Sequence, residues 1–564
     1  MKRFGMLVLF AGALVSSALA QGLEQEVVVG TPAEPPAWAK SELKAIEAMD
    51  AYLTAFLEAF VDEKTGKTIA EYDAGTMDDV AEGFAIWDKF LLSGGSQRLR
   101  DAYVKIWQYL YDEAHRRGWF VDGFYKSGYD AEHSSELFQL LWGALEMDPT
   151  NKELVKANKQ VADCIIDRCY DPKSRLIKTA WLTSSGAKEY RDYKQWDYVL
   201  NTVFIHAAWQ AYLTTGDQKY RKWALEYGTS WNELALANKG VFPYWVDNTT
   251  RQIKEPWYTG PGFPYDRWGF TTAARMYHAW PVEMVFLDKG NPEHLKGLDS
   301  TIDAMFKHGT NGMPASGVDE KGWSREKYSW HCVKVVDRPY ALTFSKEAGE
   351  RLKAYIAAIR KHDPKGSEAQ FLAWQDFAYF GGGDLDLPTK RFESIAGSAD
   401  GRRKRLLAGE YKPKTGDDFR AIGFPRLGWE YIDGSWWGLY DNGRCGGAST
   451  ASVRYFHQED GRTLCGLPKG VAALVRHIAK DHVWLLLYNA NDKPTDLIIT
   501  GGHYAQHRIE KVEEAGAAPV AVGKPVVKVT VRPRSEGGVT LRLGRCAAPP
   551  ALFPRPVEKG ASRG

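Results

Sequence analysis

The chain has 564 residues, enough for more than one domain, and its 73 basic and 71 acidic residues give a formal net charge of +2. That balance gives no electrostatic reason to expect a nucleic-acid partner. Six scattered cysteines are too few for a disulfide scaffold, and no Cys/His cluster has the spacing of a zinc site.

Residues 1–20 are predicted to be a signal peptide. Two basic residues precede an apolar run from Phe4 to Leu14, and Ala18-Leu19-Ala20 follows as a small-x-small cleavage pattern. The run is shorter than the ~20 residues that a membrane-spanning helix needs. We therefore expect a secreted or periplasmic protein with no membrane span after cleavage, in which residues 21–37 form an N-terminal extension.

Residues 38–383 show the spacing of amphipathic helices, with apolar side chains at three- and four-residue steps. A helix stop at Gly or Asp followed by a Ser, Asp or Asn cap recurs at 91–96, 145–150, 213–217 and 287–292. The interval fits two helices and one long connection. The pattern predicts a mainly α fold, an (α/α) toroid of about six helical hairpins.

The composition changes after residue 383. Residues 384–470 are rich in Gly, Arg and Trp with little periodicity and are expected to connect two domains. Short β-rich runs separated by turn residues fill 471–545 and predict a small antiparallel β-sandwich. Residues 546–564 are expected to be a disordered tail.

Aromatic residues form 13% of the chain, and several crowd into Gly/Pro-rich segments. Core packing explains most of them. Rings held on loops are also available to stack on the flat faces of sugars, and loops on a rigid scaffold are where binding sites usually lie. The candidate substrate-binding residues are Trp245, Trp257, Tyr258 and Trp268.

Asp130, His133 and Glu136 recur at three-residue steps along one stripe of a predicted helix. Carboxylates beside a histidine orient it and raise its pKa, which suits general acid or base catalysis. The alternative is a capping cluster, with Asp130 as the N-cap and Glu136 facing solvent.

Asp79 lies at the start of another predicted helix, and Asp197 and Asn201 lie four residues apart in a third. An inverting glycoside hydrolase needs a carboxylic acid and a carboxylate base ~6.5–9.5 Å apart, and two of the carboxylates at 79, 130, 136 and 197 could supply them. Capping equally explains Asp79. Asp197 and Asn201 could simply hydrogen-bond to neighbouring helices.

The segment from 258 to 278 combines a Gly/Pro-rich loop with Tyr265, Arg267 and, further on, His278. This mixture suits β-elimination at a uronic acid. A cation must stabilise the charge that builds at the carboxyl group, while a Tyr or His removes the C5 proton and another protonates the departing oxygen. Each residue could instead pack the loop onto the scaffold.

A helical toroid followed by a C-terminal β-sandwich resembles the two-domain layout of several polysaccharide lyase families and some glycoside hydrolases. The resemblance implies a carbohydrate-active enzyme. Toroid-type lyases use Asn/His/Tyr/Arg sets, and by residue type alone the counterparts here are Asn201, Tyr265, Arg267 and His278.

The leading hypothesis is an exported enzyme that cleaves a polysaccharide by β-elimination. Inverting hydrolysis is the first alternative, and a non-catalytic glycan-binding envelope protein is the second. The expected partner is a polysaccharide or oligosaccharide, acidic if elimination is the reaction, and the protein is expected to be a monomer. No cofactor is predicted, and a structural calcium ion is left open.

Overall fold

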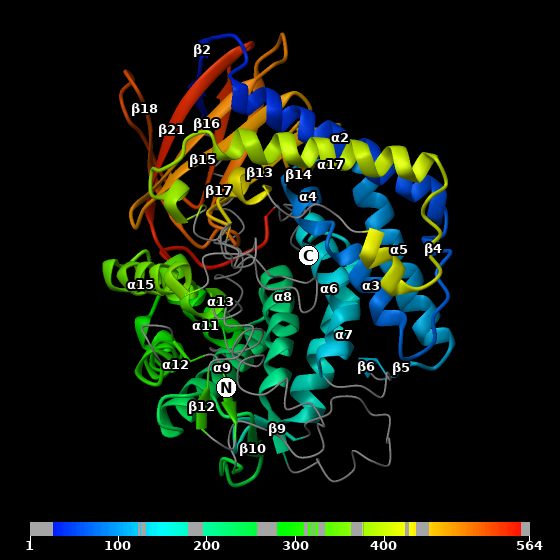
Figure 1. Ribbon diagram of the computed structural model, residues 1–564, viewed down its shortest axis with the longest axis vertical. Helices are drawn as coiled ribbons and strands as arrows, with labels where there is room; N and C mark the ends of the chain where they lie inside the picture. Colours follow the sequence, from blue (N-terminus) through cyan, green and yellow to red (C-terminus); the bar gives the residue numbers. More distant parts are fainter. Residues whose placement is uncertain are drawn as a thin grey trace, which may run out of the picture.

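The computed structural model (Figure 1) describes residues 26–121, 124–125, 131–178, 196–255, 279–309, 314–315, 317–319, 322–324, 333–362, 375, 377–422, 428–435 and 451–553. Most of the chain before residue 435 forms helices arranged in two layers, and the remainder forms a β-sandwich.

The outer layer consists of helices with one polar and one apolar face. In α5, for example, Leu99, Tyr103 and Ile106 are buried while Arg98 and Asp101 face outward. The outer helices are α2 (Ala37–Phe60), α5 (Gln97–Arg116), α7 (Lys152–Cys164), α9 (Gln218–Ala237), α12 (Lys296–Lys307), α15 (Lys346–His362) and α17 (Leu387–Leu407).

The inner layer is buried on nearly all sides, as α8 illustrates, where every residue from Ile205 to Leu213 is buried. The inner helices are α3 (Met77–Ala85), α4 (Asp88–Ser93), α6 (Ala131–Met147), α8 (Ile205–Thr215), α11 (Ala279–Lys289), α13 (Val333–Val336) and α14 (Arg338–Thr343). Consecutive members pack side by side, α3 on α6, α6 on α8, α8 on α11 and α11 on α14.

The array closes on itself. Tyr340 of α14 contacts Phe377 with ring centroids 5.3 Å apart, and Arg391 of α17 donates a hydrogen bond to Gln375. α17 then lies along the length of α2 (Figure 1). The predicted fold class, a helical toroid followed by an antiparallel β-sandwich, is confirmed.

Two kinds of connection alternate around the ring. The connection from an inner helix to the next outer helix is only a few residues long. At three of these connections the side chain of Asn151, Asp217 or Asn291 caps the helix that follows by accepting hydrogen bonds from backbone N–H groups. These are the predicted junctions, and at one of them Gly216 has a φ of +74° at the end of α8.

From an outer to the next inner helix the connections are long, and those that the structure describes contribute strands to small two-stranded sheets. The pairs are β3 (Val61–Asp62) with β4 (Lys67–Thr68), β5 (Phe120–Val121) with β6 (Phe124–Tyr125), β7 (Tyr170–Asp171) with β8 (Leu176–Ile177), β9 (Trp196–Tyr198) with β10 (Trp245–Asp247), and β11 (Gly317–Asp319) with β12 (Gly322–Ser324). We call the end of the toroid where the inner helices begin the long-connection end.

The sandwich contains two sheets with the strand orders β1-β20-β17-β13-β14 and β15-β16-β21-β18-β19, and β2 pairs with β21. Its strands are β1 (Glu26–Val29), β2 (Thr31–Pro32), β13 (Val453–Glu459), β14 (Arg462–Cys465), β15 (Val471–Ile478), β16 (His482–Asn489), β17 (Thr495–Gly501), β18 (Arg508–Glu514), β19 (Val520–Lys524), β20 (Val526–Val531) and β21 (Ser535–Gly544). Burial alternates strictly along β21, so one face of that sheet points into the core.

Two segments differ from the simple division into a helical and a C-terminal domain. β1 and β2 come from the N-terminal extension, and β1 runs parallel to β20. The stretch 384–470, which shows little period in the sequence, contains helix α17 and the strands β13 and β14. The sandwich is therefore assembled from both termini of the described chain.

The sandwich covers the end of the toroid where the inner helices finish. The backbone N–H of Leu467 donates a hydrogen bond to the carbonyl of Ser93 at the end of α4. The Arg454 guanidinium donates a hydrogen bond to the Glu146 carbonyl at the end of α6. The Arg545 guanidinium lies 4.3 Å from the ring centre of Phe344, which ends α14. In Figure 1 the sandwich occupies the top of the molecule, and β9, β10 and β12 mark the long-connection end at the bottom.

Candidate active site at the long-connection end

The candidate residues of the sequence fall at the starts of inner helices. Asp79 lies in the first turn of α3, and His133 and Glu136 lie in the first turns of α6. Asn201 lies in the short helix η4 (Val199–Phe204) that leads into α8. Since these inner helices begin at the long-connection end, the ring brings described candidates from three separate connections there.

Asp79 lies on a helix that packs against α6. Helices α3 and α6 are neighbours in the inner layer. Further along the chain, a Cβ built on Gly143 of α6 would lie 3.2 Å from the Cβ of Asp88, which begins α4. The helices that carry Asp79 and His133 therefore lie side by side.

Helix α18 (Gly416–Ile422) covers another side of Asp79. A Cβ built on Gly416 would lie 2.5 Å from the Asp79 Cβ, closer than real Cβ atoms approach, so a glycine is needed at that contact. Asp79 is half-buried. This degree of exposure leaves part of its side chain accessible at the long-connection end.

Asp197 is a completely buried carboxylate that joins several segments. It accepts backbone hydrogen bonds from Ile177 at 2.9 Å and Tyr198 at 2.7 Å, and side-chain bonds from Asn201 at 2.9 Å and the Tyr227 hydroxyl at 3.0 Å. Burial raises the pKa of Asp197 to about 7, although the four donors favour its ionised form. Asp197 and Asn201 thus bond to each other and to the scaffold.

Trp245 was predicted to bind substrate, but the structure gives it a packing role. Its side chain has no exposed surface and stacks on Tyr198, with ring centroids 4.9 Å apart and an interplanar angle of 22°. The pairing of β10 with β9 puts these two rings directly opposite each other. A sugar has no access to this indole in the structure.

The side chains of His133 and Glu136 are outside the part of the chain that the structure describes. So are all the remaining candidate residues, which are Asp130, Trp257, Tyr258, Tyr265, Arg267, Trp268 and His278.

A second polar cluster lies at the opposite, sandwich end. The Glu146 carboxylate pairs with His503 Nε2 at 3.0 Å and accepts a bond from Gln210 Nε2 at 3.0 Å. Gln210 Nε2 also lies 3.2 Å from His206 Nε2. All four side chains are buried, so this cluster joins α6, α8 and the sandwich.

Burial determines the charge states in this cluster. It lowers the pKa of His206 to about 4 and also lowers that of His503. Burial alone would raise the pKa of Glu146, but His503, Arg454 and His206 outweigh it, and the pKa falls well below its usual range. The polar residues His206 and Gln210, four apart on an otherwise apolar helix, are the only sequence signal of this cluster.

Among the described residues, no group of three or more His, Cys, Asp or Glu side chains is arranged to hold a metal ion. Within the same residues, none of the helices combines the length and apolar character needed to cross a bilayer.

A family model described as "Domain of unknown function (DUF8034)" matches residues 27–207, from β1 to the start of α8. A search of curated proteins finds no match.

Several solved structures are similar to this chain at low identity. A D-mannose isomerase has 14% identity and a TM-score of 0.40, with 57% of this chain and 86% of the other covered. A cellobiose 2-epimerase from Bacillus thermoamylovorans has 10% identity and a TM-score of 0.38, covering 57% and 87%. A family 127 β-L-arabinofuranosidase from Geobacillus stearothermophilus has 13% identity and a TM-score of 0.30, covering 90% and 81%. We infer no activity from alignments this distant.

Proposed function

We propose that this chain is an exported enzyme that cleaves a glycan at the long-connection end of the toroid. One observation carries the proposal: the inner helices whose first turns contain Asp79, His133 and Glu136 begin at one end of the toroid, while the sandwich covers the other. Sites built from several repeats are expected where a cavity is formed between them.

The proposed reaction is β-elimination at a uronic acid. Arg267 would neutralise the charge that develops at the carboxyl group, and His133, Tyr265 and His278 are the groups that would remove the C5 proton and protonate the departing oxygen. Asn201 is less suited to touch the substrate, because its amide already donates to the buried Asp197.

Inverting hydrolysis is the second candidate, and the packing of the helix that carries Asp79 against α6 favours it. Asp79 and either Asp130 or Glu136 would supply the acid and the base. Asp197 fits this role poorly, since four donors from the scaffold occupy its carboxylate.

The test is incubation of the purified full chain with a panel of polyuronides and neutral glycans, with reducing ends and ultraviolet absorbance followed together. Elimination creates a conjugated double bond, so absorbance and reducing ends should rise in parallel on polyuronides. If reducing ends appear without ultraviolet absorbance, the reaction is hydrolysis and the elimination proposal is wrong. If neither rises on any glycan, the catalytic proposal fails and glycan binding without cleavage takes its place.

Export is tested separately by sequencing the N-terminus of the protein recovered from outside the cytoplasm. Cleavage after Ala20 should leave Gln21 as the first residue. Recovery only in the cytoplasm with Met1 intact would contradict export.

A further inference from the structure

Cys164 and Cys169 lie at the two ends of a single π-helical turn. Helix α7 finishes at Cys164, and the turn η2 (Ile165–Cys169) follows it. Tyr170, the residue after the turn, donates its backbone N–H to the Ile165 carbonyl five residues earlier. This i→i+5 bond is what distinguishes the turn from the α-helix before it.

The turn type decides whether the two cysteines can meet. In an α-helix, residues five apart are separated by about 7.5 Å along the axis and point in different directions. A disulfide needs Cα atoms about 4.4–6.8 Å apart. A π turn brings the fifth residue closer to the first, and here a side-chain hydrogen bond joins the two thiols. Neither cysteine is in a disulfide in this structure.

Neighbouring contacts hold the turn in place. Lys219 of α9 forms ion pairs with Asp163 at 3.1 Å and with Asp167 at 2.9 Å, one on each side of Cys164 in the sequence. The Cys169 carbonyl accepts a bond of 2.7 Å from the backbone N–H of Lys178. The thiol pair is therefore part of an anchored segment between α7 and the β7–β8 hairpin.

The two thiols differ in access. Cys164 is buried, whereas Cys169 is half-buried. The hydrogen bond with Cys164, with smaller contributions from Lys178 and Arg168, lowers the pKa of Cys169 below that of an ordinary thiol. Cys169 is thus the more accessible member, and its lowered pKa favours the reactive thiolate.

We propose that Cys164 and Cys169 are a redox-active dithiol that a small-molecule disulfide such as glutathione disulfide converts to an intramolecular disulfide across the π turn. The Cys169 thiolate attacks one sulfur of the oxidant, which forms a mixed disulfide and releases one glutathione. Cys164, after losing its proton, attacks the Cys169 sulfur and releases the second glutathione. Two protons and two electrons pass from the protein to the oxidant.

The test equilibrates the full chain in glutathione redox buffers, quenches with acid, alkylates the remaining thiols and digests with trypsin. Trypsin cleaves after Lys159, Arg168 and Lys173, so the two cysteines fall on the peptides 160–168 and 169–173. A disulfide joins these two peptides and lowers their combined mass by two hydrogen atoms. Both cysteines carrying the alkyl label at every glutathione ratio would overturn the proposal.

Matched variants and a denatured control check the mechanism. Cys164→Ser should stop at a mixed disulfide between Cys169 and glutathione, and Cys465→Ser should leave the cross-link unchanged. Half oxidation is described by the concentration of glutathione disulfide divided by the square of the glutathione concentration. For the native chain this ratio should be about tenfold lower than for the chain in urea, because the fold holds the two thiols together. An equal or higher ratio for the native chain would show that the π turn does not promote the bond.

Discussion

At the scale of single residues, the structure separates carboxylates that are buried and hold the fold from those that are partly exposed. Asp197 illustrates the first kind. Its side chain is the acceptor for Ile177, Tyr198, Asn201 and Tyr227, which come from a hairpin, the η4 segment and an outer helix. A sequence alone gives no means of distinguishing this carboxylate from Asp79, because both lie near a predicted helix start.

Asp197→Ala should lower the free energy of unfolding by about 3 kcal/mol, because it leaves several buried donors without an acceptor. Asn201→Ala removes one of those donors and should lower it by about 1 kcal/mol. Urea denaturation followed by tryptophan fluorescence measures both. Equal losses for the two variants would contradict the central role of the carboxylate.

His206 predicts how stability depends on pH. Its folded-state pKa of about 4 lies below the ordinary value of 6.5, so the unfolded chain binds the proton first as the pH falls. The stability that the neutral, buried imidazole contributes is complete above pH ~6.5 and is lost as the pH falls towards 4. His206→Gln should therefore make the decline of stability over that range shallower, by up to about 1.4 kcal/mol per pH unit. Denaturant midpoints at pH 4.5, 5.5 and 6.5 test this, and identical slopes would contradict it.

At the scale of elements, the N-terminal strand β1 is a structural member of the sandwich. Val29 is fully buried opposite Val531, whereas Val28 points outward and is 43% exposed. Val29→Ala should lower the free energy of unfolding by about 2 kcal/mol through lost apolar contact and the cavity left behind. Val28→Ala should change it by less than about 0.5 kcal/mol. Thermal unfolding of the pair measures the difference, and similar losses would contradict the pairing.

The success of prediction at this scale depended on local signals. The helical junctions were predicted because caps such as Asn151 and Asp217 and the glycine at 216 are local features. The strand β1 has only four residues, and its partner β20 lies some 500 positions away, so nothing nearby in the sequence identifies it. Helix α17 was missed because glycines and a basic run interrupt its narrow apolar stripe, which packs along α2.

The candidate site was predictable to a smaller extent. Residue types indicated candidate segments, and the helix periodicity placed several of them near predicted helix starts. Burial was not predictable, because it is decided by segments from other parts of the chain. Trp245 is covered through the β9–β10 pairing, and the cluster of Glu146 and His503 joins residues more than 350 positions apart.

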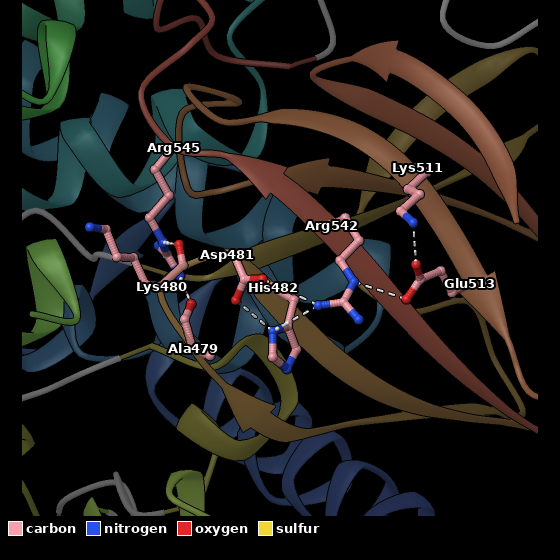
Figure 2. A network of polar contacts seen from close by, with 8 residues as sticks. All are labelled: Ala479, Lys480, Asp481, His482, Lys511, Glu513, Arg542 and Arg545. Carbon is pink, nitrogen blue, oxygen red and sulfur yellow. Dashed lines mark hydrogen bonds and ion pairs between the residues drawn. The ribbon is translucent and has the colours of Figure 1, made fainter.

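At the scale of the whole molecule, the sandwich is fastened to the toroid by a few specific contacts. Figure 2 shows Arg545 donating hydrogen bonds to the carbonyls of Ala479 and Lys480, both at 2.7 Å. The same guanidinium lies over the Phe344 ring at the end of α14. Arg542, nearby in Figure 2, instead pairs with Asp481 and Glu513 on the surface of the sheet.

These two arginines form a matched pair for mutation. Arg545→Ala should lower the free energy of unfolding by about 2 kcal/mol, since two carbonyls and an aromatic face lose their cationic partner. Arg542→Ala should lower it by less than about 1 kcal/mol, as for other exposed ion pairs. Calorimetry should also show a broader transition for Arg545→Ala as the two domains uncouple. A larger loss for Arg542→Ala would contradict this assignment.

The most direct test of the central claim compares a histidine in the first turn of α6 with a histidine in the buried cluster that joins α6 and α8 to the sandwich. His133→Gln and His206→Gln would be assayed on the polyuronide that the wild type cleaves best, and their unfolding midpoints measured alongside. His133→Gln should reduce the rate at least about 100-fold with an unchanged midpoint, as for loss of a general acid or base. His206→Gln should retain the wild-type rate per folded molecule. A normal rate for His133→Gln together with an inactive but folded His206→Gln would contradict a catalytic site at the long-connection end.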